Sequence, residues 1–231
     1  MKACWERLLP SAFLAVWFAI VFVLMSLTAR SAPVPDAGPV SRPAKALLIL
    51  GDSLAASYGV DPSEGFPALI QKKAEQAGLP FVVVNGGVSG DTTAGGLRRL
   101  DWLLRRPIDV LLVELGGNDG LRGLPVEATR SNLTSIITRT RSKYPDVEVV
   151  VAGMQMPPNL GEDYTAKFQA IFPEVAREQK ATLMPFLLEG VGGVPELNLP
   201  DLIHPTAQGH AIIASNLWLV LEPVLKRRAG S

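Results

Sequence analysis

Two short segments of the sequence contain the residue types that nucleophilic catalysis needs. The first is Gly51-Asp52-Ser53-Leu54, and the second is Asp201-Leu202-Ile203-His204-Pro205. A serine hydroxyl is a weak nucleophile until a neighbouring base removes its proton. Asp201 and His204 are close enough in one turn for the carboxylate to accept a hydrogen bond from one imidazole nitrogen. The other nitrogen of His204 can then take the proton of Ser53, if the fold brings the two segments together.

Two further segments offer hydrogen-bond donors for the negative charge that develops in such a reaction. Gly90 follows Gly86-Gly87-Val88-Ser89, and a glycine N–H can approach a ligand because no Cβ stands in the way. Asn118 lies in Gly116-Gly117-Asn118-Asp119, and its side-chain amide can donate to an oxyanion. Backbone N–H groups near Ser53, which closely follows a buried run, can also stabilise developing negative charge.

Each of these residues also has an ordinary structural interpretation. Ser53 or Asp52 can cap a helix, and for Ser53 considered alone capping and catalysis are equally consistent with the sequence. A glycine-rich turn with Asp91 as a helix cap, and an Asx turn at Asn118, are each more frequent than a catalytic role. His210 falls inside the last predicted helix, where a structural role is expected. The four segments taken together favour a catalytic site, because capping alone rarely explains all of them.

Short apolar runs alternate with longer helical patterns in the chain. The apolar runs predict buried strands at residues 46–50, 81–84, 110–113, 149–152 and 182–186. Apolar residues at helical spacing predict helices at residues 66–77, 93–105, 125–143, 164–179 and 206–226. This alternation predicts a doubly wound α/β sandwich with a mostly parallel sheet. In such folds the functional groups collect in loops beyond the carboxyl ends of the strands, where these segments lie.

The N-terminal part of the chain differs from the rest. Residues 1–31 hold a short charged head and an apolar run at residues 8–27, which predicts either a signal peptide or an uncleaved membrane anchor. Residues 32–43 carry four prolines and predict an extended linker. Residues 44–231 are then expected to form one folded domain. We expect a periplasmic or secreted protein, or one anchored in the inner membrane and facing the periplasm.

The composition excludes several classes of protein. The 22 Lys and Arg residues are balanced by 22 Asp and Glu residues, so the basic excess of a nucleic-acid binder is missing. The single cysteine, Cys4, excludes an intramolecular disulfide and a cysteine-rich metal site. Only two histidines are present, so a histidine-rich metal centre is not expected either. Apolar residues make up 48% of the chain, which excludes a disordered chain.

In their order along the chain, the four segments resemble the four blocks of the SGNH (GDSL) hydrolases, and more narrowly the bacterial multifunctional thioesterase I/lysophospholipase/arylesterase branch. The resemblance implies a flavodoxin-like, three-layer α/β/α fold with a five-stranded sheet, and a serine esterase that needs no metal or organic cofactor. It implies Ser53 as nucleophile, His204 as general base and then acid, and Asp201 as the group that orients His204. It also implies an oxyanion hole made of the backbone N–H groups of Ser53 and Gly90 and the side-chain amide of Asn118.

Apolar residues close to these segments are expected to line a groove for an acyl chain, although ordinary core packing explains them equally well. They are Leu121, Leu124, Met154, Met156, Pro157 and Ile203. The resemblance implies hydrolysis of acyl esters and thioesters, such as aryl esters, acyl-CoA and lysophospholipids, by an enzyme that we expect to be a monomer. An O-acetylated carbohydrate is the alternative substrate. A non-catalytic binding domain is the alternative function, which the intact Ser53, Asp201 and His204 disfavour.

Overall fold

The computed structural model describes residues 45–230 of this 231-residue chain. The expected signal peptide or anchor at residues 1–31, with its apolar run at residues 8–27, lies outside the described residues. The expected linker at residues 32–43 does so too, and both stay predictions. Within residues 45–230, no helix combines the length and the apolar character that crossing a bilayer requires.

The centre of the domain is a parallel β-sheet. Its strands are β1 (Lys45–Gly51), β2 (Phe81–Gly87), β3 (Val110–Glu114), β4 (Glu148–Ala152) and β5 (Thr182–Met184). The five strands lie in the order β2-β1-β3-β4-β5, and every neighbouring pair is parallel. Parallel neighbours need crossover connections, which here run through helices. The predicted fold class is therefore confirmed.

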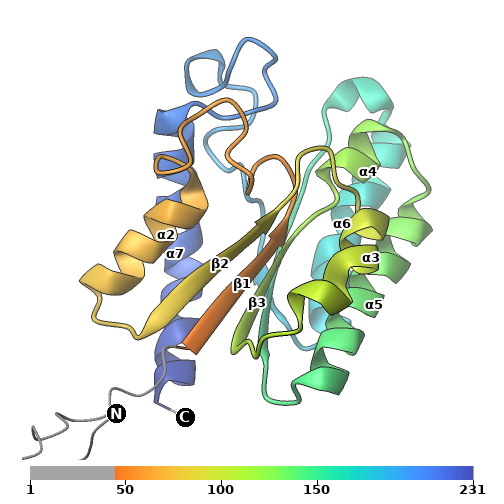
Figure 1. Ribbon diagram of the computed structural model, residues 1–231. Helices are drawn as coiled ribbons and strands as arrows, with labels where there is room; N and C mark the ends of the chain where they lie inside the picture. The colour runs from red at the N-terminus through yellow and green to blue at the C-terminus, as the bar shows by residue number, and fades with distance from the viewer. Residues whose placement is uncertain (1–44, 231) are drawn as a thin grey trace, which may run out of the picture. The chain divides into compact units, whose positions relative to one another are not determined.

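Helices cover both faces of this sheet. They are α2 (Phe66–Gln76), α3 (Thr93–Leu103), α4 (Gly117–Leu121), α5 (Val126–Lys143), α6 (Glu162–Glu178) and α7 (Ala207–Ala229), with short 3₁₀ turns η1 (Pro158–Leu160) and η2 (Pro195–Leu197). Helices α2 and α7 lie on one face, whereas α3, α5 and α6 lie on the other (Figure 1). This arrangement is the expected three-layer α/β/α sandwich.

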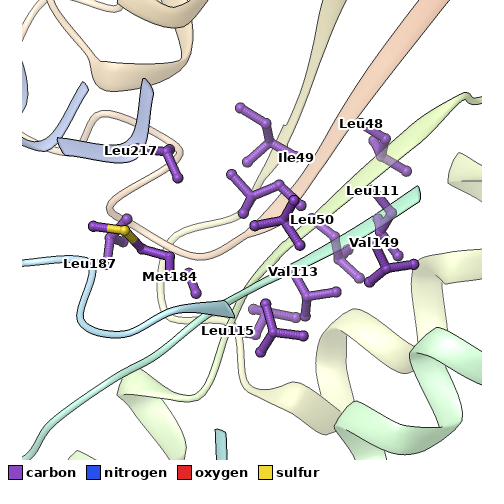
Figure 2. Close-up of a cluster of buried hydrophobic side chains, with 14 of the residues drawn as sticks. Leu48, Ile49, Leu50, Leu111, Val113, Leu115, Val149, Met184, Leu187 and Leu217 are labelled. Atoms are coloured by element: carbon purple, nitrogen blue, oxygen red, sulfur yellow. The ribbon is translucent and has the colours of Figure 1, made fainter. Parts of the chain in front are cut away.

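The paired strands β1 and β3 lie within the buried core. All five residues of β3 are buried, and Leu48, Ile49 and Leu50 of β1 have no exposed surface. Figure 2 shows Leu48 of β1 beside its register partner Leu111 of β3 and beside Val149 of β4. Burial of apolar surface stabilises the fold by roughly 25 cal/mol per Å². A slip of one residue would turn these side chains to the opposite face, so the packing fixes the register.

The two ends of the sheet have different roles. All strands point the same way, so their carboxyl ends meet at one edge, where the loops with the candidate catalytic residues begin (Figure 1). Lys45 starts β1 at the opposite edge, and α7 ends there as well (Figure 1).

Two local features differ from the expectation. The segment after β1 forms hydrogen-bonded turns rather than a helix, because Ser57 has a φ of 60° and so leaves the helical region. The last helix continues to Ala229, beyond its predicted end at residue 226, and includes Pro223. Val224 and Leu225, directly after the proline, are buried, so side-chain packing stabilises this last part of the helix.

His210 is fully buried within α7, as expected for a structural residue. Its Nδ1 atom accepts the backbone N–H of Phe66 at 3.3 Å, and the two rings stack with their centroids 6.1 Å apart. This contact joins α7 to the start of α2. Among the described residues its Nε2 atom has no hydrogen-bond partner. Burial, with a smaller effect from the charge of His204, lowers the pKa of His210 to about 4.

We predict that His210 makes the fold sensitive to acid. Its pKa is about 4 in the folded protein against an ordinary 6.5, so its stabilising contribution is complete above pH 6.5 and is lost as the pH falls toward 4. The free energy of unfolding should decrease by about 2 to 3 kcal/mol over this window. Urea denaturation of the native protein and of His210→Asn at a series of pH values checks this. The variant does not titrate at this position and should show the flatter pH dependence; equal slopes would contradict the prediction.

Candidate active site

Ser53 lies in the turn that directly follows β1. In this turn Asp52 Oδ1 accepts the N–H of Leu54 at 3.0 Å, and the carbonyl oxygen of Asp52 accepts the N–H of Ala56 at 2.9 Å. The hydroxyl oxygen of Ser53 lies 3.0 Å from Nε2 of His204. Two residues that are 151 positions apart in the sequence are therefore in hydrogen-bond contact.

Asp201 holds the opposite side of the His204 ring. Its Oδ2 atom lies 2.6 Å from His204 Nδ1, and its Oδ1 atom accepts the backbone N–H groups of Ile203 and His204, each at 2.9 Å. These bonds, led by that from the His204 N–H, lower the pKa of Asp201 to about 2. The ionised carboxylate accepts the Nδ1 proton, so Nε2 faces Ser53 with its lone pair.

Other residues that the sequence did not single out hold this loop in place. The side-chain amide of Asn198 donates to the carbonyl oxygens of Val191 and Val194 at 2.7 and 2.8 Å. The carbonyl oxygen of His204 accepts the N–H of Leu199 at 2.7 Å. The Tyr58 ring lies against the imidazole, with 4.5 Å between the ring centroids. Neither Asn198 nor Tyr58 belongs to a sequence pattern that would have revealed its place.

Asn118 reaches the site from α4, a helix that was not predicted. Gly116 precedes this helix with a φ of 123°, a conformation that favours glycine. The buried Asp119 ties α4 to α3 by accepting the N–H of Thr93 at 2.8 Å, together with the Thr93 hydroxyl. The Asn118 amide nitrogen donates to Asp52 Oδ2 at 3.1 Å. One of its two hydrogens is used in this bond, and the other is available to a ligand.

Gly90 lies in an exposed loop, with a φ of 77°. Its carbonyl oxygen accepts a hydrogen bond from Arg122 at 2.8 Å, and Gly90 is not among the residues that line the cleft at Ser53. Arg99 connects this loop to β1, because it contacts Asp91 at 2.7 Å and donates to the carbonyl oxygen of Gly51 at 2.8 Å. Asp91 is thus not the helix cap that the sequence suggested.

That cap is Thr92, the next residue along the chain. Its side chain accepts the N–H of Gly95 at 3.2 Å, at the start of α3. The Asp91 carboxylate instead faces the guanidinium group of Arg99, with which it forms a charge-assisted hydrogen bond.

A mainly apolar cleft of about 690 Å³ opens at Ser53. It is lined by Leu121, Met154, Met156, Pro157 and Ile203, as predicted for the acyl groove. Leu124 does not line it: its carbonyl oxygen accepts the Tyr164 hydroxyl at 2.9 Å, in the connection between α4 and α5. One wall comes from residues that no sequence pattern had marked, namely Phe186, Leu188, Gly192 and Gly193. They follow β5 in a segment without regular periodicity.

Two acidic side chains are buried behind the nucleophile. Burial raises the pKa of Asp52 to about 6. Glu114, the last residue of β3, has no exposed surface, and burial together with the adjacent Asp52 charge raises its pKa well above the usual range. Glu114 was not predicted as a functional residue, although a glutamate that ends an otherwise apolar strand is a signal that could have marked it.

This arrangement provides a nucleophile, a base with its orienting carboxylate and an amide donor at the mouth of one cleft. It is the arrangement that acyl transfer needs. Within residues 45–230, no group of three His, Cys, Asp or Glu side chains could hold a metal ion.

Comparison with known proteins agrees with the geometry. The GDSL-like Lipase/Acylhydrolase family model matches residues 49–212. The chain is 43% identical over 183 residues to Esterase TesA of Pseudomonas aeruginosa, covering 79% of this chain and 90% of that protein. It is 36% identical over 210 residues to Thioesterase 1/protease 1/lysophospholipase L1 of Escherichia coli K12, covering 90% and 94%. The crystal structure of TesA superposes on this structure with a TM-score of 0.75 and 41% sequence identity. The match covers 78% of this chain and 99% of the TesA chain. The chain therefore belongs to the GDSL-like lipase/acylhydrolase family, the SGNH hydrolases.

Proposed function

We propose that this protein is a serine esterase that hydrolyses acyl esters and thioesters through an acyl-enzyme intermediate. The observation that carries the proposal is the hydrogen-bonded series from Asp201 through His204 to Ser53, at the mouth of an apolar cleft. Relatives named as an esterase and as a thioesterase/lysophospholipase support the same reaction class.

The first step is attack by Ser53 on the carbonyl carbon of the substrate. Nε2 of His204, at 3.0 Å, takes the hydroxyl proton while the new C–O bond forms. The electron pair of the carbonyl π bond moves to the oxygen, which becomes an oxyanion. Asp201 stabilises the imidazolium that results and keeps its ring in place.

The oxyanion needs donors that point at it before it forms. We assign this role to the free amide hydrogen of Asn118 and to the backbone N–H of Ser53, and the resemblance to the SGNH hydrolases adds the backbone N–H of Gly90, which does not line the cleft itself. The Asn118 amide is already oriented by Asp52, and Asn118 and Ser53 line the same cleft. Removing one such donor typically lowers kcat by about 10²- to 10³-fold.

The tetrahedral intermediate then collapses to an acyl-serine. His204 gives its proton to the leaving alcohol or thiol as the bond to the acyl carbon breaks. A water molecule replaces the leaving group, His204 removes a proton from it, and a second oxyanion forms and collapses. The carboxylic acid is released and the Ser53 hydroxyl is restored, so the cycle needs no metal or organic cofactor.

The lining of the cleft favours acyl chains over acetyl groups on sugars. Apolar side chains dominate it, and Met154 and Met156 are flexible enough to adapt to chains of different lengths. Recognition of a carbohydrate would call for polar groups and aromatic platforms, of which the cleft offers few. Aryl esters, acyl-CoA and lysophospholipids are therefore the proposed substrates, and an O-acetylated carbohydrate is the alternative.

We also propose that the protein acts as a monomer in the periplasm, outside the cell, or at the inner membrane facing the periplasm. The proposed location rests on the charged head and apolar run within residues 1–31. We expect export, with either cleavage after this leader or its retention as an anchor. N-terminal sequencing of the fractionated protein distinguishes the two, and recovery of the full chain in the cytosol would contradict both.

Ser53→Ala should abolish esterase activity. Without the hydroxyl no acyl-enzyme can form, and kcat for a p-nitrophenyl ester should fall by at least about 10⁴-fold. Ser89→Ala is a matched control, because it makes the same chemical change at an exposed serine outside the proposed triad, next to Gly90 in the sequence. It should retain nearly native activity. Circular dichroism of both variants verifies folding, and an esterase rate that survives in folded Ser53→Ala would remove the mechanism.

The acyl-chain profile should favour longer acyl chains over acetyl. Each buried CH₂ group contributes up to about 0.8 kcal/mol, so kcat/KM for p-nitrophenyl octanoate should exceed that for the acetate by at least about tenfold. A panel from acetyl to palmitoyl esters measures this. Phe186→Ala should reduce the octanoate preference and leave acetate hydrolysis nearly unchanged, because Phe186 lines the cleft.

Trp102→Ala is the control for this panel. It removes an exposed aromatic side chain from α3, away from the cleft, and should leave the profile as it is. Turnover of acetylated sugars without turnover of octanoate would instead support the carbohydrate esterase.

A further inference from the structure

Glu114 lies directly behind the turn after β1 that carries Ser53. It is the last residue of β3 and pairs in register with Gly51, the last residue of β1. Its Oε2 atom accepts the backbone N–H of Asp52 at 3.2 Å, and the N–H of Ala55 is a second donor to the same carboxyl group. One buried carboxyl group therefore holds the backbone on both sides of Ser53.

The space around this carboxyl group is closely filled. A Cβ atom on Gly51 would lie 2.3 Å from Glu114 Oε2, so the carboxyl group occupies the place where a side chain at position 51 would point. Ala55 closes the same space, because the same Cβ atom on Gly51 would lie 2.5 Å from the Cβ of Ala55. Glu114 has no exposed surface. Its side chain therefore has no direct contact with bulk water.

The surroundings of Glu114 favour its neutral form. Within the part of the chain that the structure describes, no basic side chain forms an ion pair with it, and its Oε1 atom has no hydrogen-bond partner. The neighbouring carboxyl group of Asp52 is buried too. Two carboxylates in such a place cannot both be ionised without a large cost in free energy. One proton must therefore be retained by the pair.

The contacts indicate which of the two acids keeps the proton. Asp52 accepts hydrogen bonds from Leu54 N–H and from Asn118, which favour its ionised form, and a protonated His204 would favour that form further. The negative charge of Asp91, in the loop after β2, opposes the ionisation of Asp52, but Asp91 is itself paired with Arg99 of α3. Glu114 has only the two backbone donors. Asp52 is therefore the ionised member, and Glu114 is the protonated one.

We propose that Glu114 is a positioning residue that works as a neutral carboxylic acid. It accepts the Asp52 N–H and so fixes the turn that carries Ser53 and the side chain that orients Asn118. Its neutrality also keeps a second negative charge away from the developing oxyanion. This role rests on the proposed esterase mechanism and deepens it, because it places part of the control of kcat in a residue that never touches the substrate.

Two substitutions separate this role from simple packing. Glu114→Gln keeps the shape, a carbonyl acceptor for the Asp52 N–H and a neutral charge, so kcat and KM at neutral pH should each stay within about threefold of native. Glu114→Leu keeps the volume and removes the acceptor, so Asp52 N–H becomes a buried donor without a partner. We expect its kcat to fall by about 10- to 100-fold, with KM changed by less than about threefold. Glu114→Met takes its place if Glu114→Leu does not fold.

The proton itself is detected without any substrate. Infrared difference spectra of native protein against Glu114→Gln at neutral pH should contain the carbonyl band of one protonated carboxylic acid. Absence of this band, or a folded Glu114→Gln that loses as much kcat as Glu114→Leu, would overturn the proposal. If native protein hydrolysed no ester, the proposed function would fail, whereas the infrared band would still report on Glu114.

Discussion

β1 and β3 pair in a register that sets Gly51 beside Glu114, and the catalytic groups are placed relative to this pair. Ser53 leaves the sheet two residues after Gly51, and Asn118 follows Glu114 by a single tight turn. The register cannot slip, because β1 and β3 are buried on both faces and a shift would turn their side chains around. The sheet thus brings the nucleophile and the amide donor together with no help from a ligand.

The imidazole is positioned in a different way. His204 lies in a long irregular connection between β5 and α7, and hydrogen bonds take the place of sheet packing there. Asn198 ties the connection to itself by donating to two of its carbonyl groups, and Asp201 holds both the backbone and the ring of His204. The site therefore combines a rigid half with a hydrogen-bonded half. The buried acids Asp52 and Glu114 reduce the stability of the part built on β1 and β3, but they set the charge around Ser53. Such a compromise between stability and the electrostatics of the site is typical of active sites.

The sequence was sufficient to predict the sheet and the flanking helices, because buried strands appear as apolar runs and helices as apolar residues at helical spacing. It also predicted the contact of Ser53 with His204, because both residues lie in loops that were expected at the carboxyl ends of the strands. It did not predict α4, whose five residues are too few for a helical period to appear. Leu124 was misplaced because a loop next to a site gives no information on which side chain turns inward. Tyr58 and Asn198 were missed for a related reason: they act through contacts between distant segments, which no local pattern encodes.

The direction of the strands bears on how the enzyme can be attached to a solid support. Lys45 and the end of α7 lie at the edge of the sheet remote from Ser53 (Figure 1). A resin, electrode or display scaffold coupled through the end of α7 would leave the mouth of the cleft directed toward the surrounding medium. Bulky micellar or polymeric esters could then reach it without steric obstruction from the carrier.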